Sequence, residues 1–451
     1  MAKYSITASL DARVAQTIDA CTACGKCLEI CPMTLPGEID VSKAEPITSS
    51  VLDILEGGVG SAVAEKWASL CSLTGKCIDV CEYGVNPRFM LGMARRAMKL
   101  KNVAPSERKA NGKTNFAKMV KGSRTMSHMQ LTKNEINNFH RPAEEGKRPE
   151  LVFWTGCNVW RTPHIVMHCL DILDGIGTPY EVLGGPGNCC GIIQLRSGDD
   201  ENSVRQASTS NDRFAATGAK EVVSWCPTCH MQFDETIFHD GHEERPYGTS
   251  IFAGFLASRL EKLKKAFIHP VSRKVGLHLH GDMASVNQGV REVLSSIDGL
   301  EIIEFGHEMV GYQCNSISIA DYKRDAQKAQ FDAAVEAGID TLAVVYHGCY
   351  RTLCAATEEY PFEVVNYVEL IGAAMGIEHP SSFKHLKLLG DGDKVLEEVS
   401  QMIAQNAMDP DEVRAVVETE ILGVYESQSL KLGQEFIEKI GAKPAAAAEK
   451  F

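Results

Sequence analysis

Closely spaced cysteines constrain this chain more than any other feature, because 16 of its 451 residues are cysteine and most of them fall into three groups. A globular protein of ordinary hydrophobic and charged content needs fewer for packing. The first group, in CTACGKCLEICP, comprises Cys21, Cys24, Cys27 and Cys31, and Pro32 follows it. Three thiolates spaced by two residues let one loop wrap three corners of an iron–sulfur cube, while the fourth usually reaches a second cluster. The spacing therefore indicates iron–sulfur clusters; zinc, the alternative, normally uses two separated pairs.

A second group, in CSLTGKCIDVCEYGVNP, contains Cys71, Cys77 and Cys81, and Thr74 stands where a fourth cysteine would lie. Loss of the middle thiolate removes the ligand of one iron corner. We therefore expect a three-iron, four-sulfide (3Fe–4S) cluster, or a four-iron, four-sulfide (4Fe–4S) cluster with a labile corner. If the two motifs cross in the usual manner, a 4Fe–4S cluster takes Cys21, Cys24, Cys27 and Cys81, and the second cluster takes Cys71, Cys77 and Cys31.

The third group is more widely spaced. It consists of Cys157, then Cys189 and Cys190 before Gly191, then Cys226 and Cys229, with gaps of 31 residues, none, 35 and two. Short apolar runs that end at these cysteines read as strands followed by helices, which indicates an α/β unit whose ligand sites lie at the strand ends. Buried, unreactive cysteines are the alternative, but adjacent cysteines offer little to packing.

The apolar runs also reveal an internal repeat. Cys157 and His280 both end such runs and differ by 123 residues, as do Cys226 and Cys349, while Cys190 and Cys314 differ by 124. An almost constant offset predicts two duplicated lobes. The expected fold is α+β and multidomain: residues 1–100 form a helical ferredoxin-like domain, 101–149 a basic linker, 150–265 the first lobe, 270–385 a degenerate second lobe, and 386–451 C-terminal helices and a tail.

The second lobe lacks most of the cysteines that make up the third group. Its equivalent positions are His280, Gln313, Cys314, Cys349 and Thr352. We expect an empty lobe that shapes a substrate pocket; a cluster held by Cys314, Cys349, Cys354 and His280 is the alternative. His278, His307 and His347 are expected to be hydrogen-bonded core groups, although His280 occupies a ligand position. Cys169, outside every group, is expected to be a small buried hydrophobe on a helix.

Charge and hydropathy limit the partners and the cellular compartment that the sequence is consistent with. The net charge of -13 excludes a general nucleic-acid-binding surface, yet 14 Lys and Arg against four acids give residues 95–148 a net charge of about +10. This stretch is either a solvated linker or a docking surface for an acidic partner. No basic-plus-apolar leader and no run of 18 apolar residues is present. We therefore expect a cytoplasmic protein without membrane spans, in which thiols stay reduced.

The first two groups resemble the helical ferredoxin domain of the iron–sulfur subunits of succinate dehydrogenase and fumarate reductase, and of the smaller cysteine subunit of heterodisulfide reductases. The resemblance covers roughly residues 10–100. Glu82 departs from it, because proline is usual there, and a plant-type two-iron domain does not precede it. This is therefore not a complete succinate dehydrogenase iron–sulfur subunit.

The third group looks like the CCG signature of the catalytic subunit of heterodisulfide reductases, and its gaps fall inside that family's ranges. The resemblance implies a noncanonical 4Fe–4S cluster, in which two smaller units share an iron and a sulfide. Carried onto this sequence, the resemblance implies five residues that are both cluster ligands and catalytic residues: Cys157, Cys189, Cys190, Cys226 and Cys229.

Both modules in one chain resemble the fused subunits of the heterodisulfide reductase superfamily. Its relatives include subunits of sulfur-oxidising and sulfite-reductase-associated complexes and of glycerol-3-phosphate, glycolate and lactate oxidation systems. The resemblance implies an oxidoreductase subunit that moves electrons between a flavoprotein partner and a thiol/disulfide or sulfur-carrier substrate. One alternative is an electron conduit from a flavoprotein dehydrogenase toward quinone, which needs a separate membrane subunit; another is a scaffold that stores clusters. The sequence has no nicotinamide or flavin fingerprint, so electrons are expected from a partner in a multiprotein complex.

Overall fold

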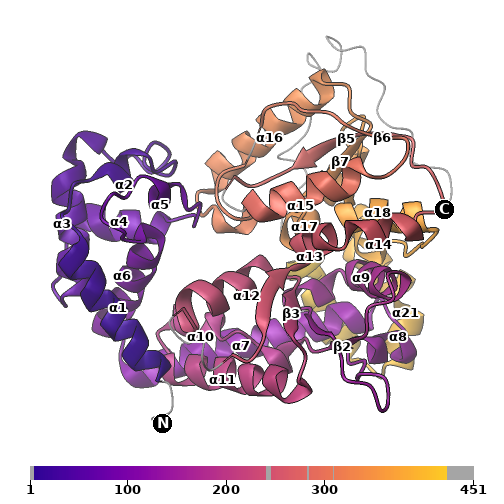
Figure 1. Cartoon of the computed structure of the whole chain (residues 1–451), viewed down its shortest axis with the longest axis horizontal. Coiled ribbons are helices and arrows are strands. Elements are labelled where there is room, and N and C mark those ends of the chain that lie inside the picture. Colours follow the sequence, from indigo (N-terminus) through magenta and orange to yellow (C-terminus); the bar gives the residue numbers. More distant parts are fainter. Residues whose placement is uncertain (1–4, 240–244, 282–283, 308, 424–451) are drawn as a thin grey trace.

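A computed structural model of the chain describes residues 5–239, 245–281, 284–307 and 309–423. A helical module formed by the N-terminal residues lies at one end, and two lobes, each with its own sheet, make up the rest (Figure 1). Across these described ranges, no helix is both long enough and apolar enough to cross a lipid bilayer.

The N-terminal module consists of short helices around cysteine loops. The helices are α1 (Ile6–Ala20), α2 (Lys26–Glu29), α3 (Ala44–Leu55), α4 (Ala62–Leu70), α5 (Lys76–Asp79) and α6 (Pro87–Asn102). Three of them begin with a side chain that accepts from a free backbone N–H group: Ser5 accepts from Ala8, Ser61 from Ala64, and Asn86 from Phe89. Trp67 is fully buried in the module's own core. The apolar residues of RFMLGMARRAMKL, residues 88–100, have the spacing of a helix and lie within α6.

The first lobe is built on a four-stranded sheet with strand order β2-β1-β3-β4. Its strands are β1 (Leu151–Trp154), β2 (Tyr180–Val182), β3 (Glu221–Ser224) and β4 (Gly248–Ile251), and all neighbours are parallel. Its principal helices are α9 (Pro163–Gly175), α10 (Ile192–Ser197), α11 (Asp200–Thr217), α12 (Pro227–Met231), α13 (Phe252–Ser258) and α14 (Leu260–Ala266). The predicted α/β arrangement with a parallel sheet is confirmed.

The second lobe has the same strand order, β6-β5-β7-β8, and is also parallel throughout. Its strands are β5 (Arg273–His278), β6 (Leu300–Ile302), β7 (Thr341–Val344) and β8 (Glu363–Asn366). Its helical segments include α15 (Ala284–Ser295), η6 (Cys314–Ser316), α16 (Ala320–Glu336), α17 (His347–Leu353) and α18 (Tyr367–Met375).

The two lobes pack through reciprocal helix pairs. Helix α9, which follows the first strand of one lobe, packs on α18, which follows the last strand of the other; α13 and α15 repeat this relationship with the lobes exchanged. Glycine allows the close approach at each pair: a Cβ on Gly372 would lie 2.4 Å from Nδ1 of His168, and one on Gly289 would lie 2.7 Å from the Ala253 carbonyl oxygen.

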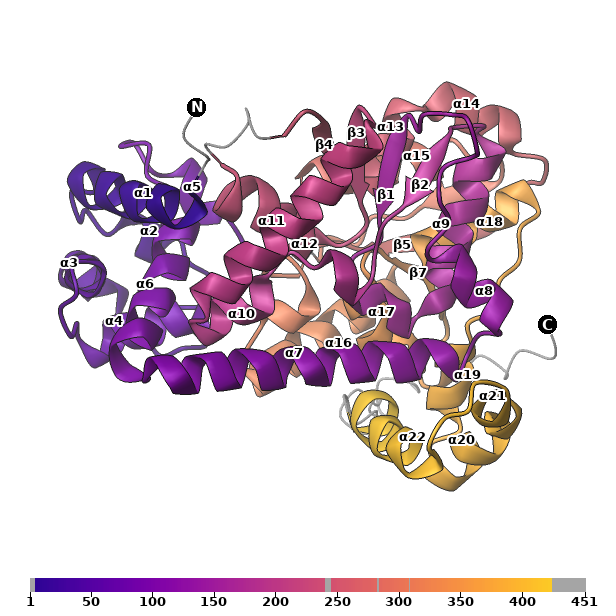
Figure 2. The same ribbon diagram turned by 90° about the horizontal axis from the view of Figure 1, so that it is seen from below.

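Residues 101–149 differ from the expected loosely packed linker, because they contain the 24-residue helix α7 (Pro105–His128). This helix runs along one side of the molecule from the N-terminal module to the C-terminal helices (Figure 2). The glycines that suggest breaks in the sequence are sites of close packing: a Cβ on Gly112 would lie 2.9 Å from Oδ2 of Asp199, and one on Gly122 would lie 2.7 Å from Nη2 of Arg161. A glycine inside a helix costs about 1 kcal/mol relative to alanine. In α7 the close packing that each glycine permits offsets this cost.

Helices after the second lobe return to the first. They are α19 (Ser382–Leu388), α20 (Gly392–Glu398), α21 (Ser400–Gln405), α22 (Pro410–Val416) and the π-helical turn η8 (Val417–Leu422). Glu420 accepts from Arg161 of the first lobe at 3.1 Å and from Arg351 of the second at 2.5 Å, which ties both lobes to this segment. Of the C-terminal helices and tail expected over residues 386–451, residues 424–451 lie outside the described residues.

Candidate functional site

The five cysteines of the third group lie at one edge of the first sheet. Cys157 follows β1, Cys189 and Cys190 follow β2 through a loop, and Cys226 follows β3 and precedes α12, which carries Cys229. Parallel strands present their carboxyl ends at the same edge, so three separate loops deliver these side chains to one place. Four of the five are buried, and Cys157 is half-buried.

Their thiols form one continuous series of contacts, from Cys157 to Cys189, Cys190, Cys229 and Cys226. Hydrogen bonds from Cys189 and Cys229 lower the pKa of Cys190 to about 5, although burial opposes the shift. A hydrogen bond from Cys229 likewise lowers the pKa of Cys226 to about 7. The same contacts and burial raise the pKa values of Cys157, Cys189 and Cys229. Thiolates are the metal-binding form of cysteine, and five thiols gathered at one place form a donor set of the kind that holds a metal centre.

Two glycines shape this site. A Cβ on Gly156, whose φ is +71°, would lie 3.0 Å from Cβ of Cys226 and 3.3 Å from Sγ of Cys229, so any side chain would fill the space between the thiols. Gly191 has a φ of +80°, and its Cβ would lie 2.5 Å from the Ser203 carbonyl oxygen of α11. Ser203 Oγ in turn donates to the Gly191 carbonyl at 2.9 Å. The glycine of the CCG sequence is therefore required by both backbone conformation and packing.

The structure brings the N-terminal cysteines together in two sets. Charge interactions link Cys27 with Cys21, Cys24 and Cys81, and these four line one small cavity. Charge interactions link Cys77 with Cys71 and Cys31 in the second set, and also with Cys27 of the first. Burial raises the pKa of Cys27 and of Cys77 to about 12, with neighbouring cysteines adding to the effect. These are the two sets expected from crossed motifs.

The two N-terminal loops share one backbone conformation. Ala23 and Leu73 have φ values of 58° and 62°, and Gly25 and Gly75 have values of 80° and 75°. Each glycine directly precedes a four-residue helix that carries the next cysteine. Thr74 thus takes the place in the second loop that a cysteine takes in the first.

The surroundings of the second set fit an iron–sulfur cluster. Among the described residues, the buried hydroxyls of Ser72 and Thr74 have no hydrogen-bond partner. An unpartnered buried donor is costly, and sulfides or thiolates of a bound cluster would accept from it. Together with the clustered thiols, this fits the cofactor class that the cysteine spacing indicates.

Comparisons with known proteins agree with this geometry. Residues 151–234 match the CCG cysteine-rich domain, a range that contains all five cysteines of the third group. The chain is 23% identical over 405 residues to a subunit of the dihydromethanophenazine:CoB–CoM heterodisulfide reductase of Methanosarcina mazei, covering 82% of this chain and 97% of that protein. It is 24% identical over 308 residues to a subunit of the fumarate reductase (CoM/CoB) of Methanothermobacter marburgensis, covering 66% of this chain and 58% of that protein. The chain is a heterodisulfide-reductase-like iron–sulfur protein.

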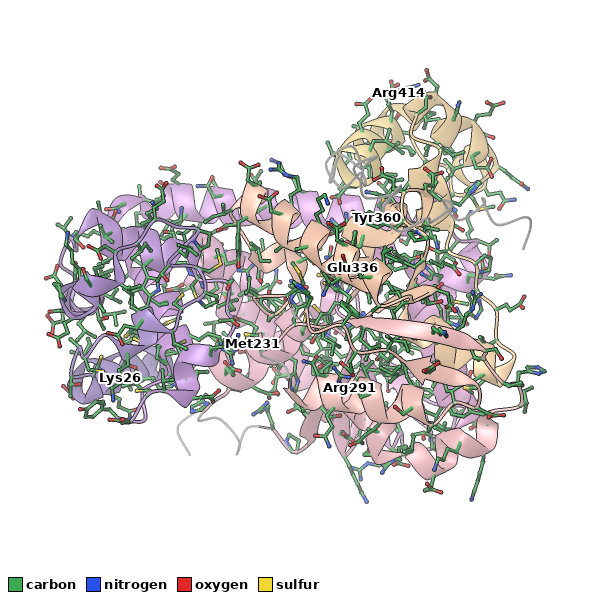
Figure 3. All side chains as sticks on the ribbon, turned by 90° about the horizontal axis from the view of Figure 1, so that it is seen from above. Lys26, Met231, Arg291, Glu336, Tyr360 and Arg414 are labelled. Atoms are coloured by element: carbon green, nitrogen blue, oxygen red, sulfur yellow. The ribbon has the colours of Figure 1, made fainter. Side chains whose placement is uncertain are left out.

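A pocket of about 470 Å³ separates the N-terminal module of this heterodisulfide-reductase-like chain from its first lobe. Leu73 of the second cysteine loop lines one side and Thr228, between Cys226 and Cys229, lines the other. Met231 lies on the face of the first lobe that is turned toward the module, whereas Lys26 lies on the module itself (Figure 3). No sequence pattern points to this pocket, because its walls come from three distant segments.

The pocket is rich in cationic side chains. Its basic lining residues are Arg88, Arg95, Arg96, Lys99 and Arg196, against one acid, Glu235. Arg95 donates to the Cys71 carbonyl at 3.4 Å, and burial lowers its pKa. Arg88 is paired with Glu235 at 2.5 Å and Arg96 with Asp200 at 2.8 Å. The cations favour a ligand with anionic groups, and Leu73 and Thr228 place the pocket beside a cysteine-bearing segment of each site.

In the second lobe, the side chains that lie together differ from the alternative set of Cys314, Cys349, Cys354 and His280. His278 and His280 lie beside Cys314 and Cys349, whereas Cys354 is buried elsewhere, near Lys387. His347 is buried and accepts from Trp225 at 3.2 Å between the lobes, as expected of a hydrogen-bonded core group. The expectation is wrong for His307, which is exposed; its backbone carbonyl, not its ring, accepts from Gln330 at 2.6 Å. Cys169 is fully buried on α9, as predicted.

Proposed function

We propose that the chain is the iron–sulfur oxidoreductase subunit of a heterodisulfide-reductase-like complex, and that it transfers electrons between a flavoprotein partner and a thiol/disulfide substrate. One observation carries the proposal: a basic pocket is lined both by Thr228, which lies between Cys226 and Cys229 of the five-thiol series, and by Leu73 of the Cys71 loop. Substrate and electron donor sites would then share one cavity.

The proposed cofactors follow the three thiol sets. The chain would hold a 4Fe–4S cluster at Cys21, Cys24, Cys27 and Cys81, a 3Fe–4S or labile 4Fe–4S cluster at Cys71, Cys77 and Cys31, and a noncanonical 4Fe–4S cluster at Cys157, Cys189, Cys190, Cys226 and Cys229. The shared contacts within each set and the unpartnered hydroxyls beside Cys71 support this assignment.

The reaction is the reduction of a disulfide by two electrons and two protons to two thiols, or its reverse. Two one-electron deliveries from the flavoprotein partner supply the electrons, and an iron corner open to a thiolate would let the sulfur–sulfur bond break in single-electron steps. The chain's own residues hold the substrate: Arg196 and Arg95 would bind its anionic groups, since hydrogen bonds between charged partners are stronger than neutral ones.

We further infer that the two lobes are a duplication in which the first kept the cysteine set. Their identical strand order and the exchanged helix pairs, α9 with α18 and α13 with α15, support this inference. The helical ferredoxin character of the N-terminal module is supported by its paired cysteine loops.

The competing function is an electron conduit toward quinone, favoured by the three-thiol set at Cys71 and by the match to a fumarate reductase component. Anaerobically reduced full-length protein should be mixed with acidic disulfides or with quinones, and reoxidation followed optically. We expect disulfides to oxidise the wild type and not the Cys190→Ser variant, while Cys354→Ala, a buried cysteine outside the three sets, behaves as wild type. The conduit would be favoured if quinone reoxidised all three proteins equally and no disulfide reoxidised any of them.

A further inference from the structure

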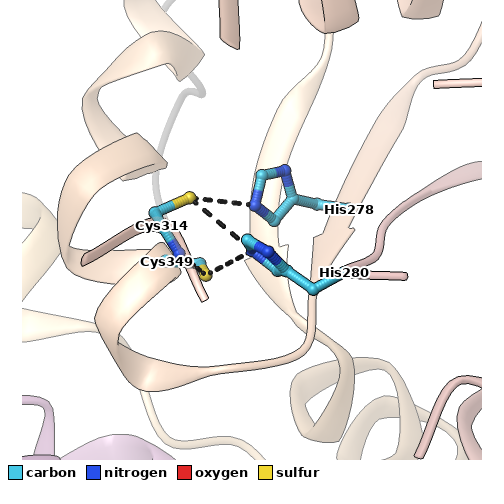
Figure 4. A group of neighbouring side chains, drawn as sticks. All are labelled: His278, His280, Cys314 and Cys349. Atoms are coloured by element: carbon cyan, nitrogen blue, oxygen red, sulfur yellow. Dashed lines mark hydrogen bonds between the residues drawn. The ribbon is translucent and has the colours of Figure 1, made fainter. Parts of the chain in front are cut away.

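Four side chains with metal-ligating atoms meet at the carboxyl edge of the second sheet. They come from the end of β5 (His278 and, just beyond it, His280), from η6 (Cys314) and from α17 (Cys349). One ligand atom of each lies within 4.8 Å of the others, and exposure of the four residues does not exceed 1% (Figure 4). We propose that these four residues bind a single Zn²⁺ ion.

The distances match one tetrahedral ion. Cys314 Sγ lies 3.2 Å from Nε2 of His278 and 3.8 Å from Nε2 of His280, and Cys349 Sγ lies 3.3 Å from Nε2 of His280. Zinc bonds of about 2.3 Å to sulfur and about 2.0–2.1 Å to nitrogen place a nitrogen and a sulfur about 3.6 Å apart on a tetrahedron. The observed distances lie on both sides of that value.

The outer nitrogens of both imidazoles are already used, which leaves the inner ones as ligands. Nδ1 of His278 lies 2.5 Å from Oε1 of Gln330, and Nδ1 of His280 lies 3.0 Å from the Gly311 carbonyl oxygen. Gln330 donates through Nε2 to the His307 carbonyl, which fixes its oxygen toward His278. Each ring thus carries its proton on Nδ1 and presents an unprotonated Nε2, the arrangement that orients histidine ligands in metal sites.

A two-iron cluster fits this site poorly. With two histidines and two cysteines, such a cluster places the histidines on one iron and the cysteines on the other. Here each histidine lies within 3.8 Å of a cysteine, so the four ligands surround one point. Sulfur and nitrogen in a closed tetrahedral set favour Zn²⁺.

The ion would fix a loop that contacts both cysteine centres. Just before Cys314 in the chain, Tyr312 hydroxyl lies 2.8 Å from Oγ1 of Thr228, between Cys226 and Cys229. A Cβ on Gly311 would lie 3.0 Å from the Ser72 carbonyl oxygen in the Cys71 loop. Four protein ligands leave no open position, so the role of the ion is structural.

The test uses the full-length protein as isolated anaerobically. Elemental analysis should give about one zinc ion per chain in addition to iron, and zinc-edge X-ray absorption should show two nitrogens at about 2.0 Å and two sulfurs at about 2.3 Å. These two measurements need no variant. Absence of zinc, or a shell of four sulfurs, would overturn the proposal.

Variants then locate the ion. Cys314→Ser and His278→Gln should each lose the zinc and keep the iron, while the matched control Cys354→Ala keeps both. Iron content serves as the check on folding, because the iron sites depend on the other cysteines. Zinc retained in both variants, or iron lost in Cys314→Ser while circular dichroism is unchanged, would contradict the assignment.

Discussion

Thr74 occupies the position in the Cys71 loop that Cys24 occupies in the Cys21 loop. Left-handed residues flank both positions, Leu73 and Gly75 in one loop and Ala23 and Gly25 in the other. The backbone that would present a fourth thiol is therefore already formed.

Because of this relationship, Thr74→Cys should add the missing ligand and convert a three-iron electron paramagnetic resonance signal into a four-iron one. The signal is to be recorded after mild oxidation of anaerobically purified protein. Thr341→Cys, at a buried threonine on β7 in the second lobe, is the matched control and should leave the signal unchanged. An unaltered signal in Thr74→Cys would sink the assignment of Cys71, Cys77 and Cys31 to one cluster.

The cysteine sets and the parallel sheets could be predicted from the sequence because both depend on local patterns. Spacing determines which thiols one loop can present, and short apolar runs such as β1 and β7 form fully buried central strands. The edge strands β2 and β6 could not be predicted in the same way, since each has only three residues. Short segments of this kind carry too little pattern to be separated from loops.

Two other features depend on tertiary contacts. The glycines of α7 resemble breaks in the sequence because the side chains that approach them, Asp199 and Arg161, are distant in the chain. A histidine such as His278 at the end of a strand is ordinarily expected to be a buried, hydrogen-bonded residue. Its spacing of two from His280 nevertheless indicates that the two side chains lie together, because alternate residues of a strand lie on the same face. Only the fold shows that Cys314 and Cys349 meet that face.

Arg196 provides a test of substrate charge. Arg196→Gln should raise the KM for an acidic disulfide roughly tenfold with a smaller change in kcat, because a hydrogen bond between charged groups is lost. Arg196→Lys, which keeps the charge, should recover part of the loss. Arg205→Gln, at an exposed arginine outside the pocket lining, is the control. Equal KM values in all these proteins would show that the pocket does not bind the substrate's anionic groups.

His168 should make stability depend on pH. It is buried between α9 and α18, and burial lowers its pKa to about 4 despite the nearby Glu369, with His164 and His379 also facing it. The unfolded chain binds this proton below pH 6.5 and the folded chain only near pH 4, so stability present above pH 6.5 is lost as the pH falls through this window.

The loss assigned to His168 between pH 7.5 and pH 5 is about 2 kcal/mol. Unfolding by urea, compared between wild type and His168→Met at both pH values, isolates it, because all other titrating groups are common to the two proteins. The variant should lose less stability on acidification. Parallel losses in both proteins would mean that His168 is not kept neutral by the fold.

The basic stretch, residues 95–148, leads to a prediction about the rate at which the chain associates with a partner. Lys109 and Lys121 of α7 pair with Glu201 and Glu412, so their charges are partly used within the chain. Lys113 and Lys118 are exposed on the same helix. If the stretch docks an acidic flavoprotein, reversing these two residues to Glu should slow association severalfold and flatten its salt dependence, since rim charges act mainly on the association rate.

Association is to be measured by stopped flow while the Debye length falls from roughly 30 to 8 Å. Lys262 and Lys265, exposed lysines of α14, serve as the matched pair; reversing them should leave the rate unchanged, because they lie outside the basic stretch. Cluster signals should be the same in all variants. An association rate independent of salt in the wild type would instead assign α7 a purely structural role, in which its cations are solvated or paired within the chain and its glycines serve packing.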